Sequence, residues 1–238
     1  VLVEGILKKQ DKEKNIFKGK AGYGGGENYN GGDIQLAYSS GKKVGIMFNA
    51  FFAGNTENVQ ETNSSSSHKE SGKGSYVETG IGYYKPFGAA NKWIFETYGG
   101  AGVGGENHTY KAFQTSRLSI SKLFIQPSLG ISTNDGHFEA AIGSRFARLN
   151  LKIKQNNVSS DPDNEEEKQQ LDFISTHPSS LLWEPSGLVA GGWRNFKFFL
   201  EYTATLNMTN PELAQDTHSL ILGIKFSLKS NPDKNQKE

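Results

Sequence analysis

The fold class is decided by the stretch FKFFLEYTATLNM, which runs from Phe196 to Met208. Its side chains alternate in polarity along the chain. One parity carries the apolar set Phe196, Phe198, Leu200, Tyr202, Ala204 and Leu206, and the other carries the polar set Lys197, Glu201, Thr203, Thr205 and Asn207. An alternation with a period of two predicts a β-strand with one apolar and one polar face. Phe199 is the exception on the polar face.

Similar alternation recurs through most of the sequence and predicts an all-β fold. We expect about ten strands, near residues 17–26, 32–40, 43–54, 73–87, 92–106, 115–133, 136–153, 181–193, 196–208 and 217–228. The best helical candidate is NEEEKQQLDFI at 164–174, which we expect to be part of a loop insertion because its apolar side is narrow.

The connections between these segments alternate strictly between short and long. The short ones are SSGKK, FGAANK, TNDG and GWRN, whereas the long ones are polar and include the regions 54–74 and 154–180. In an up-and-down sheet this pattern places all short turns at one end and all long loops at the other. We therefore expect a single closed antiparallel up-and-down barrel over 17–228, with eight to twelve strands possible, an N-terminal arm at 1–16 and a tail at 229–238.

The sorted loops and the apolar parity indicate a transmembrane barrel, because such barrels have short turns at one end and an apolar outer surface. The side chains expected to face lipid are Phe196, Phe198, Leu200, Tyr202, Leu220, Leu222, Ile224 and Phe226. Aromatic residues also gather near the short turns, where membrane interfaces favour them. The alternative is a soluble lipocalin-like binding barrel, in which the apolar parity would line a core or a pocket.

The polar parity is expected to face the barrel lumen. It combines many glycines with a balanced set of charges, and the proposed network consists of Glu78, Glu96, Glu139, Arg145, Lys197, Glu201 and Lys225. Small residues and paired charges suit the interior of a narrow barrel. These carboxylates could form a catalytic or ion-conducting set, but a salt-bridged plug is the favoured interpretation.

Composition excludes several classes of function. The chain of 238 residues has no cysteine, which excludes disulfides, thiolate metal sites and a cysteine nucleophile. Its formal net charge of +1 provides no general attraction for nucleic acid. No run approaches the length of a membrane-spanning helix, and no apolar leader is visible, so Val1 is expected to lie in or near the mature chain. No cofactor or metal is expected.

The long loops carry the residues that a rim-loop hydrolase would need. The histidines are His68, His108, His177 and His218, and nearby acids are Asp161, Asp163 and Asp216. Paired His and Asp side chains can activate water or a nucleophile. The acidic run DPDNEEEK at 161–168 could bind a divalent cation, but it lacks the pattern of a dedicated calcium loop and is expected to be solvated.

Several stretches resemble the small outer-membrane barrel lipoproteins of Bacteroidota-type bacteria. They are DIQLAYSSGKKVGIMFNAFFA at 33–53, GIGYYKPFG at 80–88, FETYGGAGVGG at 95–105, LFIQPSLGI at 123–131 and WEPSG at 183–187. The likeness covers roughly Phe17 to Leu228, and the ending GIKFSL resembles the terminal signal for barrel insertion, although Lys229 to Glu238 follow it. Members of this group usually carry a lipidated cysteine, which this chain lacks.

The resemblance implies an outer-membrane location in a Gram-negative envelope, with periplasmic termini, extracellular long loops and contact with lipid and lipopolysaccharide. It assigns no activity. We expect a non-enzymatic structural or accessory subunit of a larger outer-membrane complex, with Gly19, Ala21, Gly99 and Ala101 as candidate contact residues. A narrow channel or a surface ligand-binding barrel is the alternative, and a rim-loop hydrolase is less favoured.

Overall fold

A computed structural model describes residues 15–39, 43–60, 67–110, 114–158 and 165–229. Its strands are β1 (Ile16–Gly25), β2 (Asn30–Ser39), β3 (Val44–Gln60), β4 (Ser67–Phe87), β5 (Trp93–Thr109), β6 (Thr115–Ser132), β7 (Phe138–Asn156), β8 (Ser179–Trp193), β9 (Phe196–Ala204), β10 (Leu206–Asn207) and β11 (His218–Lys229). A short 3-10 helix, η1, spans Ala89–Asn91, and one α-helix, α1, spans Glu165–Thr176. Within the described residues, no helix is long and apolar enough to cross a membrane.

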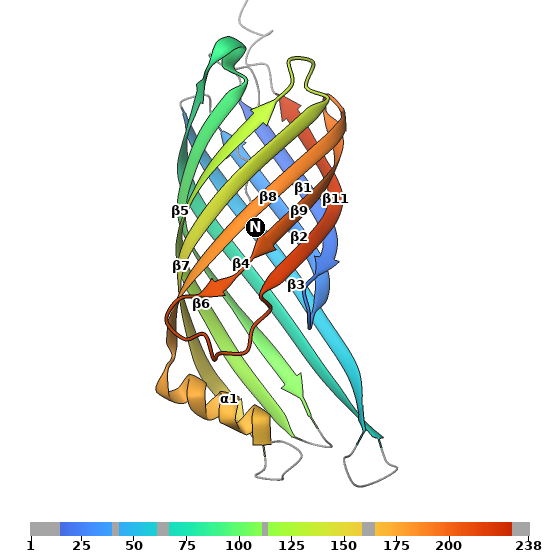
Figure 1. Cartoon of the computed structure of the whole chain (residues 1–238), viewed down its shortest axis with the longest axis vertical. Coiled ribbons are helices and arrows are strands. Elements are labelled where there is room, and N and C mark those ends of the chain that lie inside the picture. The colour runs from blue at the N-terminus through green and yellow to red at the C-terminus, as the bar shows by residue number, and fades with distance from the viewer. Residues whose placement is uncertain (1–14, 40–42, 61–66, 111–113, 159–164, 230–238) are drawn as a thin grey trace, which may run out of the picture.

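The strands form one closed antiparallel barrel (Figure 1). Apart from the two-residue β10, each strand pairs with the strand that follows it, and β11 closes the barrel by pairing with the whole of β1, from Ile16↔Lys229 to Gly25↔Leu220. The two-residue β10 follows β9 after a break at Thr205 and pairs with β8, as β9 does. The prediction of a closed up-and-down barrel of ten strands is confirmed.

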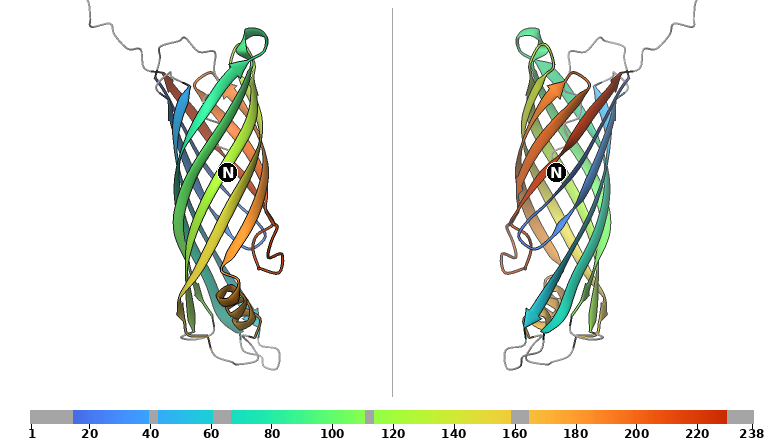
Figure 2. Two further views of the ribbon diagram at one scale, coloured as in Figure 1. Left: turned by 90° about the vertical axis from the view of Figure 1, so that its left-hand side faces the viewer. Right: turned by 90° about the vertical axis from the view of Figure 1, so that its right-hand side faces the viewer.

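The short turns lie together at one end of the barrel, and α1 lies at the other (Figures 1 and 2). Asp135 organises the turn between β6 and β7, because its carboxylate accepts hydrogen bonds from the Thr133 hydroxyl at 2.5 Å and from the His137 amide at 3.0 Å. These two bonds lower the pKa of Asp135. Gly88 and Gly136 occupy positive φ angles of 76° and 72° in the turns, where glycine is favoured.

The region 54–74, expected to be a loop, is largely strand. β3 continues to Gln60 and β4 begins at Ser67, and their pairing extends unbroken from Gly54↔Lys73 to Gln60↔Ser67. The prediction was wrong because this part of the hairpin is polar and rich in Asn, Ser and Gly, so it shows no alternation of apolar and polar residues.

The region 154–180, also expected to be a loop, contains the end of β7 and the helix α1. Three glutamates occupy the first turn of α1, where the helix dipole favours negative charge. Leu171 and Ile174, three residues apart, share the buried side of the helix. The narrow apolar side noted in the sequence is therefore sufficient for one helix packed against a barrel.

Burial alternates along each strand, with inward side chains buried and outward side chains exposed. β9 shows the pattern most clearly, since Lys197, Phe199 and Glu201 are buried while Phe196, Phe198, Leu200 and Tyr202 are exposed. Phe199, the exception in the sequence pattern, packs inside the barrel against Leu188, Ala190 and Ile221.

Candidate functional site: a filled lumen and an apolar outer surface

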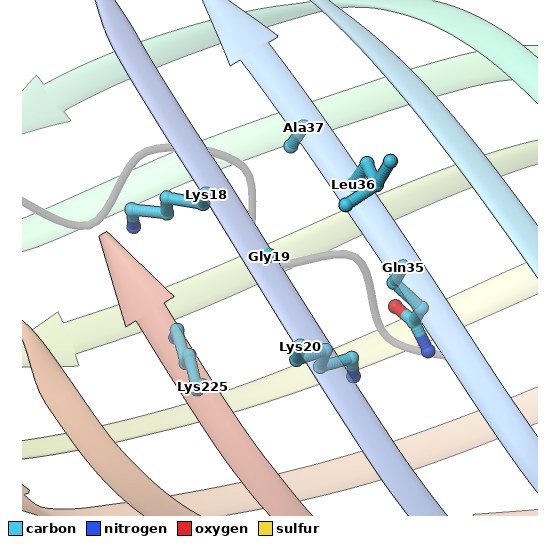
Figure 3. Close-up of a pocket in the computed structure, with 7 residues that line it drawn as sticks. All are labelled: Lys18, Gly19, Lys20, Gln35, Leu36, Ala37 and Lys225. Atoms are coloured by element: carbon cyan, nitrogen blue, oxygen red, sulfur yellow. The ribbon is translucent and has the colours of Figure 1, made fainter. Parts of the chain in front are cut away.

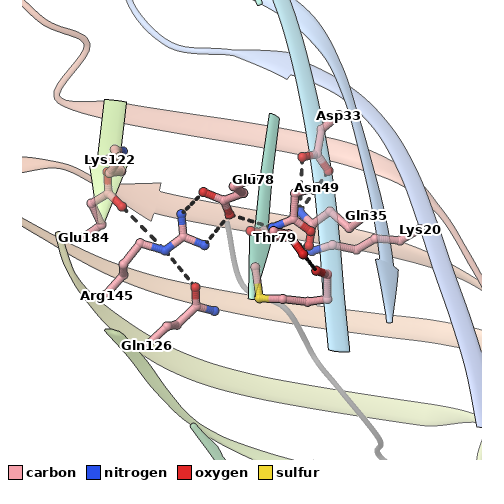
Figure 4. Close-up of polar contacts among 12 residues, drawn as sticks. Lys20, Asp33, Gln35, Asn49, Glu78, Thr79, Lys122, Gln126, Arg145 and Glu184 are labelled. Carbon is pink, nitrogen blue, oxygen red and sulfur yellow. Dashed lines mark hydrogen bonds and ion pairs between the residues drawn. The ribbon is translucent and has the colours of Figure 1, made fainter. Parts of the chain in front are cut away.

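A cluster of charged side chains around Arg145 fills one part of the lumen (Figure 4). The Arg145 guanidinium on β7 donates to both carboxylate oxygens of Glu78 on β4, at 3.2 and 3.0 Å. Its Nε donates to Gln126 Oε1 at 2.7 Å, and Asn49 Nδ2 donates to Glu78 Oε1 at 2.7 Å. A bidentate pair of this kind fixes both side chains, so Arg145 connects β7 to the non-adjacent strand β4.

The same cluster includes an ion pair that the sequence analysis missed. Lys122 Nζ lies 2.8 Å from Glu184 Oε1, and Arg145 Nε lies 3.7 Å from Glu184 Oε2. Glu184 was missed because β8 carries large apolar residues on both faces: Trp183 is exposed, while Leu182 and Leu188 are buried. The strand therefore shows no clean alternation from which the inward parity could be read.

A second cluster joins three strands through Glu139 on β7. One carboxylate oxygen accepts from Lys197 at 3.0 Å, and the other accepts from Lys225 at 2.7 Å. The ammonium of Lys18 interacts electrostatically with Glu139 and with the buried Glu96. Lys197 on β9 and Lys225 on β11 face each other in the pairing register, so one carboxylate bridges the two neighbouring lysines.

A third pair, Lys20 with Glu201, lies beside an aromatic ring. The two charged groups form a buried ion pair, and Lys20 Nζ also lies 5.1 Å from the centre of the Phe199 ring. All seven residues proposed for the lumen network are thus buried inside the barrel and distributed over these clusters. Burial of each charge is offset by an opposite charge nearby.

One small cavity lies beside the lysines of the lumen. A cavity of about 20 Å³ is lined by Lys18, Gly19, Lys20, Gln35, Leu36, Ala37 and Lys225 (Figure 3). Lys18 Nζ and Gln35 Oε1 find no hydrogen-bond partner among the described residues. A cavity of this size holds about one water molecule, which can accept from an ammonium and donate to an amide oxygen. The cavity is far too small for an organic substrate.

The helix α1 packs against the barrel at the end opposite the short turns (Figure 1). Leu171 and Ile174 of α1 pack with Leu118 of β6 and with Leu213, which lies between β10 and β11. Gln170 ties the helix to this segment, because its Nε2 donates to Glu212 O at 3.3 Å and its Oε1 accepts from Ala214 N at 3.1 Å. These contacts make an apolar lid, formed by Leu118, Leu171, Ile174 and Leu213.

Replacing Leu171 with aspartate should detach α1 from the lid while leaving the barrel closed. Replacement of a buried leucine by alanine costs about 2–5 kcal/mol of stability. Aspartate removes the same apolar contacts and also adds an unpaired carboxylate. A glutamate-specific protease should then cleave much faster near Glu165 to Glu167. Gln169→Asp adds the same charge on the exposed side of the helix and should leave cleavage unchanged. Equal cleavage of both variants would contradict the lid.

The outward surface carries a continuous apolar belt. All eight side chains expected to face lipid are exposed, with Phe198 59% and Leu222 62% exposed. All three tryptophans, Trp93, Trp183 and Trp193, are also on this surface. Tyr84 differs from its neighbours near the short turns, because it points inward and accepts a hydrogen bond from Ser39 Oγ at 2.8 Å. A soluble monomer rarely exposes so large an apolar surface.

The small outward residues do not form one surface. Ala21, Gly99 and Ala101 are exposed, but Gly19 is covered by the ring of Phe226, which a Cβ at this position would strike. Gly99 and Ala101 lie on β5 between larger neighbours, since Gly99 pairs with Ile81 on one side and Ile125 on the other.

The described rim histidines each contact local partners. His108 lies 3.4 Å from the Tyr29 hydroxyl and 3.5 Å from Glu106 Oε2. His218 lies 3.5 Å from Glu27 Oε1, and His177 stacks on Phe173 with ring centres 4.6 Å apart.

Of the three acids expected beside these histidines, Asp216 lies within the described residues. Asp216 accepts hydrogen bonds from Asn28 instead. The side chain of His68, as well as Asp161 and Asp163, lies outside the described residues. In the described part of the rim no His–Asp pair is formed, and no group of three metal-binding side chains occurs there. Glu165 to Lys168 of the acidic run form the first turn of α1.

Comparison with known proteins finds structural likeness only. No family model and no curated protein matches the chain. Among solved structures, it is similar to OmpT, an outer membrane protein of Vibrio cholerae, with 12% identity, a TM-score of 0.33 and coverage of 89% of this chain and 61% of OmpT. This chain therefore spans about three fifths of the length of OmpT.

Two autotransporter domains are similar over nearly their whole length. The translocator domain of NalP from Neisseria meningitidis matches with 10% identity, a TM-score of 0.43 and coverage of 92% of this chain and 90% of that one. The β domain of the Bordetella autotransporter BrkA matches with 9% identity, a TM-score of 0.42 and coverage of 91% and 100%. The barrel assignment rests on the strand pairing of this chain itself.

Proposed function

We propose that this chain is a non-enzymatic outer-membrane β-barrel with a filled lumen, which serves as a structural or accessory subunit of a larger membrane complex. The termini would face the periplasm, and the long hairpins and α1 would face the exterior. The belt of outward apolar side chains supports the membrane location, because lipid accepts such a surface. The closed barrel supports it as well, because it leaves no unpaired strand edge in lipid. No cofactor, metal or nucleic acid is part of this proposal.

The filled lumen is the observation that carries the proposal. Charged side chains from non-adjacent strands meet at hydrogen-bonding distance, and the cavity beside Lys18 and Lys225 measures about 20 Å³. The apolar lid packs against one end as well. An interior built in this way supports a role in holding the wall in shape, with interactions on the outer surface or at the loops.

Purification of the tagged protein from native membranes in mild detergent tests the accessory role. We expect a partner protein in a fixed ratio, and Ala101→Trp on the exposed surface of β5 should weaken its retention if this surface forms the contact. Val103→Trp, on the same strand and also exposed, is the matched control. Recovery of the barrel alone, with no partner in a fixed ratio, would contradict an accessory role.

A narrow channel remains the second candidate because the lumen is lined with charges and contains Lys18, whose ammonium has no hydrogen-bond partner among the described residues. The salt bridges around Glu139 and Arg145 predict no steady conductance of the wild-type protein in a planar bilayer. Conductance that changes in size or selectivity with Glu96→Gln or Lys197→Met would favour the channel over the plug.

A further inference from the structure

We infer that the outward face of β6 and β7, beyond the apolar belt, binds the phosphate-bearing headgroups of membrane lipids. The inference rests on the proposed membrane location and adds a ligand class to it. The site consists of Arg117 on β6 and Arg148, Lys152 and Lys154 on β7, called the basic patch below. All four side chains are exposed.

The position of the basic patch follows from the alternation along β7. Ile142 and Phe146 are outward members of the belt, and Arg148 and Lys152 continue the same parity. Across the β6–β7 pairing, Arg148 lies opposite Leu123, and Lys152 lies opposite Ser119. Leu123 is 59% exposed and belongs to the belt. Arg148 therefore lies at the line where the apolar surface ends and the cations begin.

The register shift between Arg117 and Leu118 adds to the local density of positive charge. Leu118 pairs with Ile153, whereas Arg117 pairs with Gln155, so Lys154 is the extra residue of a bulge beside Lys152. Asn107 Oδ1 accepts a hydrogen bond of 2.6 Å from Arg117 Nε and orients that guanidinium. The two arginines and two lysines thus occupy one short stretch of two paired strands.

In this part of the sheet, the described acidic side chains lie on the inward face or on α1. Beyond the belt, the described outward positions of β5 to β8 carry Gly, Asn, Thr, Ser, Arg, Lys, Gln and Leu, and none is acidic. The glutamates of α1 belong to a helix that packs on the inward face, through Leu171 and Ile174 against Leu118. Among the described residues, the basic patch therefore has no acidic side chain beside it on the outward face.

The basic patch and the apolar residues next to it are suited to bind an anion that also carries apolar chains. Arginine binds phosphate through two parallel hydrogen bonds, and lysine adds a point charge. Directly next to these cations, Leu123, Ile125 and Phe146 offer apolar surface for acyl chains. A lipid with a phosphate monoester headgroup meets both requirements at once, whereas free phosphate meets only the first. Basic residues near a membrane surface attract anionic lipid additively.

Trp183 provides a local reporter for this site. It is exposed on β8 and pairs with Phe146, two residues before Arg148. In a Trp93→Phe/Trp193→Phe protein, Trp183 is the only tryptophan. This protein would be reconstituted in phosphatidylcholine vesicles that contain a minority of chain-brominated phosphatidic acid or, in parallel, of chain-brominated phosphatidylcholine. Bromine quenches tryptophan only at close range.

We expect brominated phosphatidic acid to quench Trp183 more strongly than brominated phosphatidylcholine does. The difference should correspond to a local enrichment of phosphatidic acid around Trp183 on the order of tenfold. The enrichment should fall with added salt and should disappear in Arg148→Gln/Lys152→Gln/Lys154→Gln. A matched variant, Lys43→Gln/Lys85→Gln/Lys92→Gln, removes three exposed charges near the short turns and should keep the enrichment.

The outcomes separate this inference from the membrane proposal. Equal quenching by both brominated lipids, or an enrichment that ignores salt, overturns headgroup binding and leaves the membrane location standing. Absence of quenching by either lipid overturns both. Because the salt dependence is measured on the protein with its basic patch intact, the test does not depend on folding of the triple variant.

Discussion

Replacement of Arg145 by methionine is expected to lower the free energy of unfolding of the barrel by about 3–5 kcal/mol. Arg145 is the central cation of its cluster, where it contacts Glu78, Gln126 and Glu184. Its removal leaves Glu78 hydrogen-bonded to Asn49 and Glu184 paired with Lys122, but takes the guanidinium away from two buried carboxylates. Methionine keeps much of the volume but provides no hydrogen-bond donor.

Urea unfolding in lipid vesicles, followed by tryptophan fluorescence, measures this effect. Lys85→Met is the control, because Lys85 on β4 is exposed on the outward face and lies outside the basic patch. The control should change the unfolding free energy by about 0.5 kcal/mol or less. Similar unfolding curves for Arg145→Met and the wild-type protein would show that the salt-bridged interior does not stabilise the barrel.

Replacement of Leu222 by arginine is expected to destabilise the membrane-inserted barrel by about 2–4 kcal/mol. Leu222 on β11 is 62% exposed and lies between Tyr23 of β1 and Leu200 of β9, both on the outward face. In lipid, an arginine at this position must bring its charge into an apolar medium. In water, the same substitution would be nearly neutral or would improve solubility.

The sign of this effect therefore distinguishes a lipid-facing belt from a soluble surface. Thr56→Arg is the control, because Thr56 is exposed on β3 four residues beyond Phe52 and pairs with the polar Ser71. The fraction of protein that inserts into vesicles, and its unfolding free energy there, should fall for Leu222→Arg and stay constant for Thr56→Arg. Equal behaviour of both variants would argue against lipid contact at Leu222.

The fold could be predicted from the sequence wherever the two faces of a strand meet different surroundings. FKFFLEYTATLNM alternates because Phe198 and Leu200 are outward while Lys197 and Glu201 are inward. The pattern fails where both faces meet the same medium. The sequence of 54–74 is almost entirely polar and predicts a loop, and β8 carries large apolar residues on both faces, so its alternation does not mark Glu184 as inward.

The partners inside the lumen could not be predicted from the sequence. Arg145 on β7 meets Glu78 on β4, and Lys20 on β1 meets Glu201 on β9, although neither pair belongs to adjacent strands. Such contacts depend on the tilt and stagger of the closed sheet, which alternation does not report. The parity of a strand shows which side chains are inside, and closure of the barrel decides which of them meet.

The most direct test of the account is quenching of the three native tryptophans by chain-brominated phosphatidylcholine in reconstituted vesicles. Trp93, Trp183 and Trp193 are all exposed on the outward face, and no other tryptophan dilutes the signal. If the belt lies in lipid, the fluorescence of all three tryptophans should be strongly quenched, and the protein should be recovered in the vesicle fraction. Unquenched emission from folded protein that stays in the aqueous fraction would contradict it.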